Sequence, residues 1–264
     1  MLPYINFLGR DIPTYGICMA VGLLVSGFAA CFRAKRFKAD INMLIVVMAS
    51  AVGFGLLGAK LLYIPATYGL RNALDEMSRG DFSSLTGGGL VFYGGLIFGT
   101  IGGIVAARLS GENIERTAAI LIPCVPLGHV FGRIGCYLAG CCYGRPYSGT
   151  FGLKTVQDGV ICTLFPIQLL ESMLNIIIFL ILILFLRKFS GYAILSSYLF
   201  MYSIVRFTLE FFRGDELRKC AFLIHFTVDK SCFACCQYNI IGGISSQAKD
   251  YGRLSSKKII QRKY

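Results

Sequence analysis

Arg133 places a charged guanidinium at the end of a long apolar stretch. The residues before it, from 117 to 131, are apolar or small apart from His129 and two prolines. A charged side chain at membrane depth costs about 3 kcal/mol or more, so it normally faces a cavity and meets an anion there. Lipid phosphate is the most available anion, and a guanidinium can bind it through two parallel hydrogen bonds. Arg133 is therefore a candidate phospholipid-binding residue; the alternative is an arginine that anchors its helix at the headgroup level.

A second group of charges lies near the end of the last clear apolar run. Arg206, Glu210 and Arg213 are four and three residues apart, which predicts that all three lie on one helical face. Glu210 can pair with either arginine and leave the other for an anion, although a salt-bridged helix end is the alternative. Two helices that present arginine at the same membrane face predict a phosphate clamp.

Other polar residues in the apolar runs are candidates for separate roles. Tyr93, in the run Phe-Tyr-Gly-Gly, can donate a hydrogen bond or move a proton. Interfacial tyrosines are common in membrane proteins, and this alternative holds for Tyr15 as well. His129 is interpreted as a satisfied core histidine rather than a base. Glu171 requires a partner within the membrane, and Lys60 is a candidate.

Three cysteines follow Arg133 closely. Cys141 and Cys142 are adjacent and lack the C-x-x-C spacing of zinc sites and redox couples, so they and Cys136 are interpreted as small residues that shape a turn. No cofactor and no metal ligand is assigned from the sequence.

Composition places these residues in a membrane protein. The chain of 264 residues is 55% apolar, lacks Trp and carries a net charge of +12. The basic residues lie in short loops between apolar runs rather than on one soluble face, so we expect no nucleic-acid partner.

Six apolar runs are long enough to cross a lipid bilayer. They are residues 14–32, 42–64, 88–107, 117–139, 166–186 and 191–212. Pro123 and Pro126 predict a break in the fourth run. Most glycines in these runs predict close helix packing, but Gly94 and Gly95, with residues 87–89, are dense enough to predict backbone that lines a cavity. The expected fold is an all-α polytopic membrane bundle with six transmembrane helices, and a seventh is left open after Lys219.

Basic residues also predict the orientation of the bundle. Loops 33–41, 108–117 and 187–190 contain eight Lys or Arg, whereas the longer loops 1–13, 65–87 and 140–165 contain five. By the positive-inside rule the first set is cytoplasmic, so the loop after Arg133 and the end of the sixth run face outward. We divide the chain into a transmembrane domain, residues 1–218, and a C-terminal segment with a basic tail, residues 219–264.

The order of the motifs resembles the prolipoprotein diacylglyceryl transferase family of bacterial plasma-membrane enzymes. The matching stretches are 15–16 (Tyr-Gly), 58–63 (Gly-Ala-Lys-Leu-Leu-Tyr), 88–95 (Gly-Gly-Leu-Val-Phe-Tyr-Gly-Gly), 132–144, 166–171 (Pro-Ile-Gln-Leu-Leu-Glu) and 206–213 (Arg-Phe-Thr-Leu-Glu-Phe-Phe-Arg). The resemblance implies transfer of the diacylglyceryl group of phosphatidylglycerol to the lipobox cysteine of a preprolipoprotein signal peptide. It implies lipid bilayer, phosphatidylglycerol and prolipoprotein as partners, and a site toward the outer leaflet.

The resemblance also implies roles for individual residues. Arg133 matches the family's phospholipid-binding arginine, Arg206 the second essential one, and Glu210 would orient Arg206. Tyr15 occupies a family site position. The remaining candidates are Tyr93 as a catalytic residue, and Gly94, Gly95, Gly144 and Arg213 as substrate-binding residues. Many members have His where this chain has Tyr93, Asn where it has Cys136 and Glu where it has Cys141.

Two other functions fit parts of the pattern. A phospholipid-binding relative that has lost transfer would keep the arginines. A small-solute transporter would explain the Gly- and Pro-interrupted runs but predicts internal repeats, and none is found.

Overall fold

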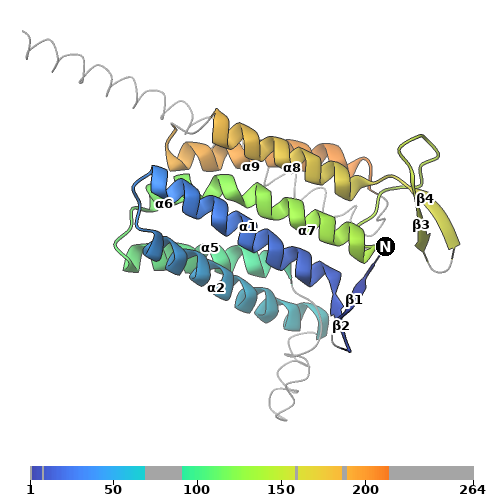
Figure 1. The fold of residues 1–264 in the computed structure, drawn as a ribbon, viewed down its shortest axis with the longest axis horizontal. Helices are drawn as coiled ribbons and strands as arrows, with labels where there is room; N and C mark the ends of the chain where they lie inside the picture. The colour runs from blue at the N-terminus through green and yellow to red at the C-terminus, as the bar shows by residue number, and fades with distance from the viewer. Residues whose placement is uncertain (1, 8, 69–90, 158–159, 186–188, 214–264) are drawn as a thin grey trace, which may run out of the picture. The chain divides into compact units, whose positions relative to one another are not determined.

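The computed structural model describes residues 2–7, 9–68, 91–157, 160–185 and 189–213 (Figure 1). The predicted glycine cluster at 87–89 and the C-terminal segment, 219–264, lie outside these residues. The described residues divide into two compact units. The first takes in those of Met1–Ala30 and Ala118–Tyr264, and the second those of Cys31–Thr117.

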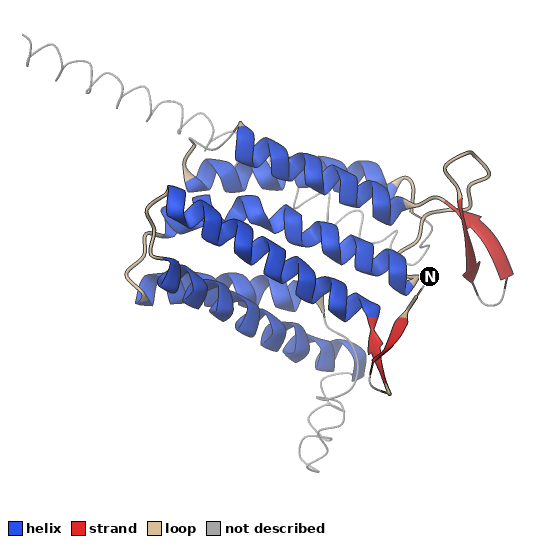
Figure 2. Ribbon diagram, in the orientation of Figure 1, coloured by secondary structure: helices blue, strands red, loops and turns tan. Residues whose placement is uncertain are grey.

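Helices long and apolar enough to cross a membrane account for all six predicted spans in the described residues. They are α1 (Thr14–Arg36), α2 (Ile41–Tyr68), α5 (Phe92–Leu109), the stretch Ile114–Ala139, α8 (Ile167–Leu184) and α9 (Gly191–Glu210). The all-α membrane bundle is confirmed. The strands are confined to two short hairpins (Figure 2), β1 (Tyr4–Phe7) with β2 (Arg10–Pro13), and β3 (Leu153–Gln157) with β4 (Val160–Leu164).

The fourth span is broken where the prolines predict it. Helix α6 (Ile114–Leu121) passes into a 3₁₀ turn, Ile122–Cys124, and continues as α7 (Val125–Ala139). Proline lacks the N–H that an α-helix uses, and its ring crowds the preceding turn. The 3₁₀ turn therefore replaces regular α-helix where the prolines occur.

Glycines let the helices of each unit approach closely. In the first unit, a Cβ on Gly22 of α1 would lie 2.8 Å from Cβ of Phe131 on α7. In the second unit, α2 and α5 lie side by side (Figure 1), and a Cβ on Gly99 of α5 would lie 2.9 Å from the carbonyl oxygen of Ala51. Small residues at such contacts increase van der Waals packing between helices in lipid.

Replacing Gly99 by Val tests this packing. The new side chain would press on the α2 backbone, which cannot move aside as a flexible side chain can, and we expect a loss of about 1–3 kcal/mol in stability. The matched control is Gly53→Val on α2, because a Cβ at Gly53 meets no atom within 4 Å. Thermal unfolding of the purified protein in detergent measures both, and equal melting temperatures for the two variants would contradict the packing role.

Candidate functional site

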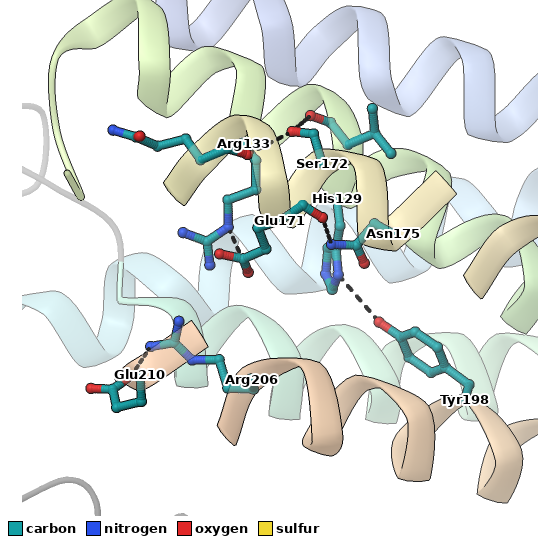
Figure 3. Close-up of polar contacts among 10 residues, drawn as sticks. His129, Arg133, Glu171, Ser172, Asn175, Tyr198, Arg206 and Glu210 are labelled. Atoms are coloured by element: carbon teal, nitrogen blue, oxygen red, sulfur yellow. Dashed lines mark hydrogen bonds and ion pairs between the residues drawn. The ribbon is translucent and has the colours of Figure 1, made fainter. Parts of the chain in front are cut away.

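Arg133 forms an ion pair with Glu171 between two helices of the first unit (Figure 3). Arg133 lies in the second half of α7, and Glu171 lies in the first turns of α8; Nε and Oε1 are 3.0 Å apart. The glutamate side chain is 3% exposed and the arginine side chain 22%. The cation that meets Glu171 is Arg133 of the same unit, a pairing that the sequence did not predict; Lys60, the candidate from the sequence, belongs to the second unit. The contact uses the Nε edge of the guanidinium, so its two terminal nitrogens can serve another acceptor.

Arg206 forms the second ion pair, within α9. Its Nη2 lies 3.1 Å from Oε2 of Glu210, one helical turn later, as the spacing predicts. The Arg206 side chain is 14% exposed, and its Nη1 is buried with no hydrogen-bond partner among the described residues. Because an unsatisfied buried donor on a cation is costly, this nitrogen indicates a place for an anion.

Arg213 does not share the helical face predicted for it. Helix α9 ends at Glu210, and Arg213 pairs with Gly144 in an isolated antiparallel β-bridge. The prediction assumed that the helix continued, but its last backbone groups bond to nearby residues in a turn. Arg213 therefore lies at the end of α9 without being on its Arg206 face.

The loop after α7 brings the ends of three helices together. The Arg145 backbone N–H donates to the Phe212 carbonyl at 3.1 Å, beyond the end of α9, and the Phe165 N–H donates to the Arg145 carbonyl at 3.1 Å, just before α8. Gly144 lies between these strands of chain, where a Cβ would come within 3.1 Å of the Phe212 carbonyl oxygen. Gly144 is thus required by close backbone approach, whatever else it contacts.

Polar side chains of α8 fix that helix against α7. Gln168 donates to the Cys141 carbonyl at 2.9 Å, and the Ser172 hydroxyl lies 3.3 Å from the Val130 carbonyl oxygen. Both side chains are buried. Together with Glu171 they make one face of α8 polar, and their contacts fix the position of α8 along α7.

Tyrosines of α9 extend the network that surrounds the arginines. Tyr202 lies within electrostatic range of Arg133, Arg206 and Glu171. The Tyr198 hydroxyl lies 3.2 Å from Nδ1 of His129, so the interpretation of that histidine as a satisfied core residue is confirmed.

Neither Tyr202 nor the pairing of Arg133 with Glu171 was predicted from the sequence. A signal for Tyr202 is present, because Tyr198, Tyr202, Arg206 and Glu210 recur every four residues along one side of α9.

The turn after α7 gathers three thiols. Helix α7 ends at Ala139 and is capped by Gly140, whose φ is 74°, and the Cys141 N–H donates back to the Cys136 carbonyl at 3.1 Å. The Sγ atoms of Cys136, Cys141 and Cys142 all lie within 4.8 Å of one another. Hydrogen bonding from the other two thiols lowers the pKa of Cys142, burial opposes this, and the charge of Arg133 adds to it. The residues shape a turn, as predicted, and the turn also forms a cluster of sulfur atoms.

Tyr15 lies beside this cluster. It lies in the first turn of α1, packs its ring against Gly135 of α7, and is within electrostatic range of Cys136 and Arg133. Its side chain is 41% exposed, so it remains accessible to a ligand.

Tyr93, Gly94 and Gly95 belong to the second unit. Tyr93 is 54% exposed near the start of α5, with its ring edge-on to Phe92 at 5.9 Å between centroids. A Cβ on Gly94 would overlap the carbonyl oxygen of Gly58, and one on Gly95 would lie 3.6 Å from Cβ of Ala59. Close packing against α2 is a sufficient reason for a glycine at position 94. The glycine there is therefore no evidence that the backbone lines a cavity, as the sequence predicted.

Comparison with known proteins points to one family. A family model described as prolipoprotein diacylglyceryl transferase matches residues 3–244. The chain is 32% identical over 219 residues to a phosphatidylglycerol–prolipoprotein diacylglyceryl transferase of Clostridium tetani, covering 80% of this chain and 84% of the relative. It is 31% identical over 214 residues to one of Clostridioides difficile, covering 80% and 83%.

Replacing Glu171 by Gln tests the ion pair. The change leaves the Arg133 guanidinium without its anion; breaking a fully buried pair costs about 3–5 kcal/mol, and the partial exposure of Arg133 reduces this. We expect Glu171→Gln to lower the melting temperature in detergent more than Glu210→Gln, since Glu210 is 26% exposed.

The double variant Arg133→Gln/Glu171→Gln separates charge from packing. Removing both ions leaves no unpaired charge, so part of the lost stability should return. A double variant that loses as much as the two single variants combined would contradict the coupling between these side chains.

Proposed function

The chain belongs to the prolipoprotein diacylglyceryl transferase family, and we propose that its two arginines hold the phosphate of phosphatidylglycerol during transfer to a cysteine thiol. The acceptor is the lipobox cysteine in the signal peptide of a preprolipoprotein, and the enzyme is a multi-pass protein of the bacterial plasma membrane. The observation that carries the arginine roles is the buried Nη1 of Arg206, which has no hydrogen-bond partner within the described part of the chain, at the helix ends where Arg133 also lies.

Arg133 would bind the lipid headgroup. Glu171 neutralises the guanidinium partly and fixes its plane through Nε, which leaves the terminal nitrogens to donate to phosphate oxygens. Lysine, a point charge with no such fork, could not serve the carboxylate and the phosphate in this way.

Arg206 would stabilise the departing phosphate. In the transfer, the acceptor sulfur forms a bond to the glyceryl carbon while the bond from that carbon to the phosphate oxygen breaks. The electron pair of the broken bond stays on glycerol phosphate, and the product is a thioether. Fixed cations aimed at the leaving oxygen lower the barrier because the negative charge on it grows in the transition state. Glu210 holds Arg206 in place.

The other candidates would contact the lipid. Tyr15, beside the cluster that follows Arg133, and Gly144 with Arg213, in the bridged turn, surround the arginine end of the first unit. Gly95 would let the lipid backbone approach α5, whereas Gly94 is taken up by packing against α2. The phenol O–H of Tyr93 can donate a hydrogen bond, so we assign it as a donor to the lipid.

The arginine site would face the outer leaflet. The basic loops 33–41, 108–117 and 187–190 favour a cytoplasmic location for the opposite side. Prolipoproteins reach the outer side with the lipobox at the membrane surface, so this orientation brings thiol and phospholipid to one place.

Arg133→Ala and Arg206→Ala test the clamp. We expect each to lower transfer from phosphatidylglycerol to a lipobox peptide by at least about 10²-fold, the usual cost of losing a donor to developing charge. Mass spectrometry of the peptide, with purified protein in detergent, measures the rate.

The control is Lys154→Ala, which removes an exposed basic side chain on β3 and should leave the rate unchanged. The same variants can be tested for lipoprotein modification in cells depleted of their own enzyme. An unmutated chain that transfers nothing in either assay would support the alternative of a lipid-binding relative.

Tyr93→Phe tests the phenol. If the hydroxyl donates a hydrogen bond to the reacting lipid, the variant should lose about 10²-fold in rate while its melting temperature stays unchanged, because the ring is kept. A loss below about threefold would assign Tyr93 to packing or lipid contact. Tyr192→Phe, a change to another half-exposed tyrosine, is the matched control.

A further inference from the structure

The thiols of Cys136, Cys141 and Cys142 form a compact sulfur cluster that the transfer chemistry described above does not use. Cys136 lies in the last turn of α7, and the other two follow the reversal at Gly140. Each pair of Sγ atoms lies within 4.8 Å, although the chain must turn back on itself to achieve this. One of the thiols is buried, one half-buried and one exposed, so the cluster opens toward the surface.

The backbone of the turn is held in an unusual conformation. Cys142 has a φ of 58°, in the left-handed region that a residue with a Cβ enters at a cost of about 1–3 kcal/mol. The hydrogen bond from Gln168 to the Cys141 carbonyl, at 2.9 Å, ties the turn to α8. A strained residue that the surrounding structure keeps in place is typical of ligand-binding sites.

The number and spacing of the sulfurs fit a metal ion better than a disulfide. A disulfide would use two thiols and leave the third, whereas catalytic zinc sites use three protein ligands and keep a fourth position open. With bonds of about 2.3 Å and tetrahedral angles, sulfurs around zinc lie about 3.8 Å apart. The cluster therefore needs to contract by no more than about 1 Å to hold the ion.

We propose that Cys136, Cys141 and Cys142 bind one zinc ion as thiolates, and that the ion's fourth position takes the sulfur of the acceptor cysteine. The second half of this statement rests on the proposed function. Three thiolates and Zn²⁺ carry a net charge of −1, and the acceptor thiolate makes it −2. Arg133 and Arg213 lie within electrostatic range of Cys142 and offset this charge.

Zinc would supply what the phenol at position 93 cannot. The acceptor thiol must lose its proton before its sulfur attacks carbon, and a zinc-bound thiol is deprotonated at neutral pH. The proton passes to water when the sulfur binds. The bound sulfur then uses an electron pair to form the bond to the glyceryl carbon, while the carbon–oxygen bond breaks toward phosphate. No oxidant or reductant is needed.

Metal binding is tested on the purified full-length chain in detergent. Elemental analysis should find one zinc per chain, and Co²⁺ added to the metal-free protein should give the intense sulfur-to-cobalt charge-transfer absorption. The variant Cys136→Ser/Cys141→Ser/Cys142→Ser should lose both signals. If that variant does not fold, Cys142→Ser alone should weaken Co²⁺ binding by at least about tenfold.

Two control variants keep the assignment specific. Cys232, Cys235 and Cys236 include a C-x-x-C spacing, so their triple Ser variant must retain the metal. The triple Ser variant of Cys18, Cys31 and Cys162 must retain it as well. Loss of the metal in the triple variant of Cys232, Cys235 and Cys236 overturns the proposal. It is also overturned if Cys136, Cys141 and Cys142 are isolated with a disulfide and bind no Co²⁺ after reduction.

The fourth position is tested with peptide. A lipobox peptide should shift the cobalt spectrum, and the same peptide with Ser in place of its Cys should not. An unchanged spectrum overturns the role of the acceptor sulfur. These readouts do not require turnover. A chain that binds cobalt and peptide but transfers nothing supports the metal site and contradicts the proposed function. A chain that transfers without metal supports the proposed function and contradicts the metal site.

Discussion

The ion pair between Arg133 and Glu171 is the constraint on which the rest of the first unit depends. Each ion alone would cost several kcal/mol if it faced lipid chains, so the two helices that carry them must turn these faces toward each other. Gln168 and Ser172, which bond to the backbone around α7, set the same rotation of α8. The position of α8 along α7 is therefore determined by polar contacts, whereas the surrounding apolar contacts favour burial without selecting one register.

The same ion pair connects stability with chemistry. A guanidinium has donors on several edges, so Glu171 can hold Arg133 through Nε while the terminal nitrogens keep donors for the phosphate of the proposed function. Arg206 repeats the arrangement with Glu210 within one helix and retains a buried donor without a described partner. In both cases a carboxylate orients the cation and uses only part of its hydrogen-bonding capacity. In the proposed function, cations held in this way need little reorganisation when negative charge develops.

The turn that follows α7 has two structural roles. Through Gly144 and Arg145 it joins the ends of α8 and α9, and so brings the two arginines to one end of the first unit. Through the reversal at Gly140 it gathers the thiols beside Arg133. The turn that ends helix α7 thus places Arg133 and a group of three thiols close to each other.

The sequence by itself determined the six apolar spans, the proline break in the fourth and the Arg206–Glu210 pair, because length, missing N–H groups and four-residue spacing act within one segment. It could not show that α9 ends before Arg213, since competing turn bonds with Gly144 decide that end. Only the tertiary structure decided that Glu171 meets Arg133 and that the thiols converge. Partners far apart in the chain, and the direction of a turn, depend on how helices rotate against one another, and that rotation follows from all their contacts together.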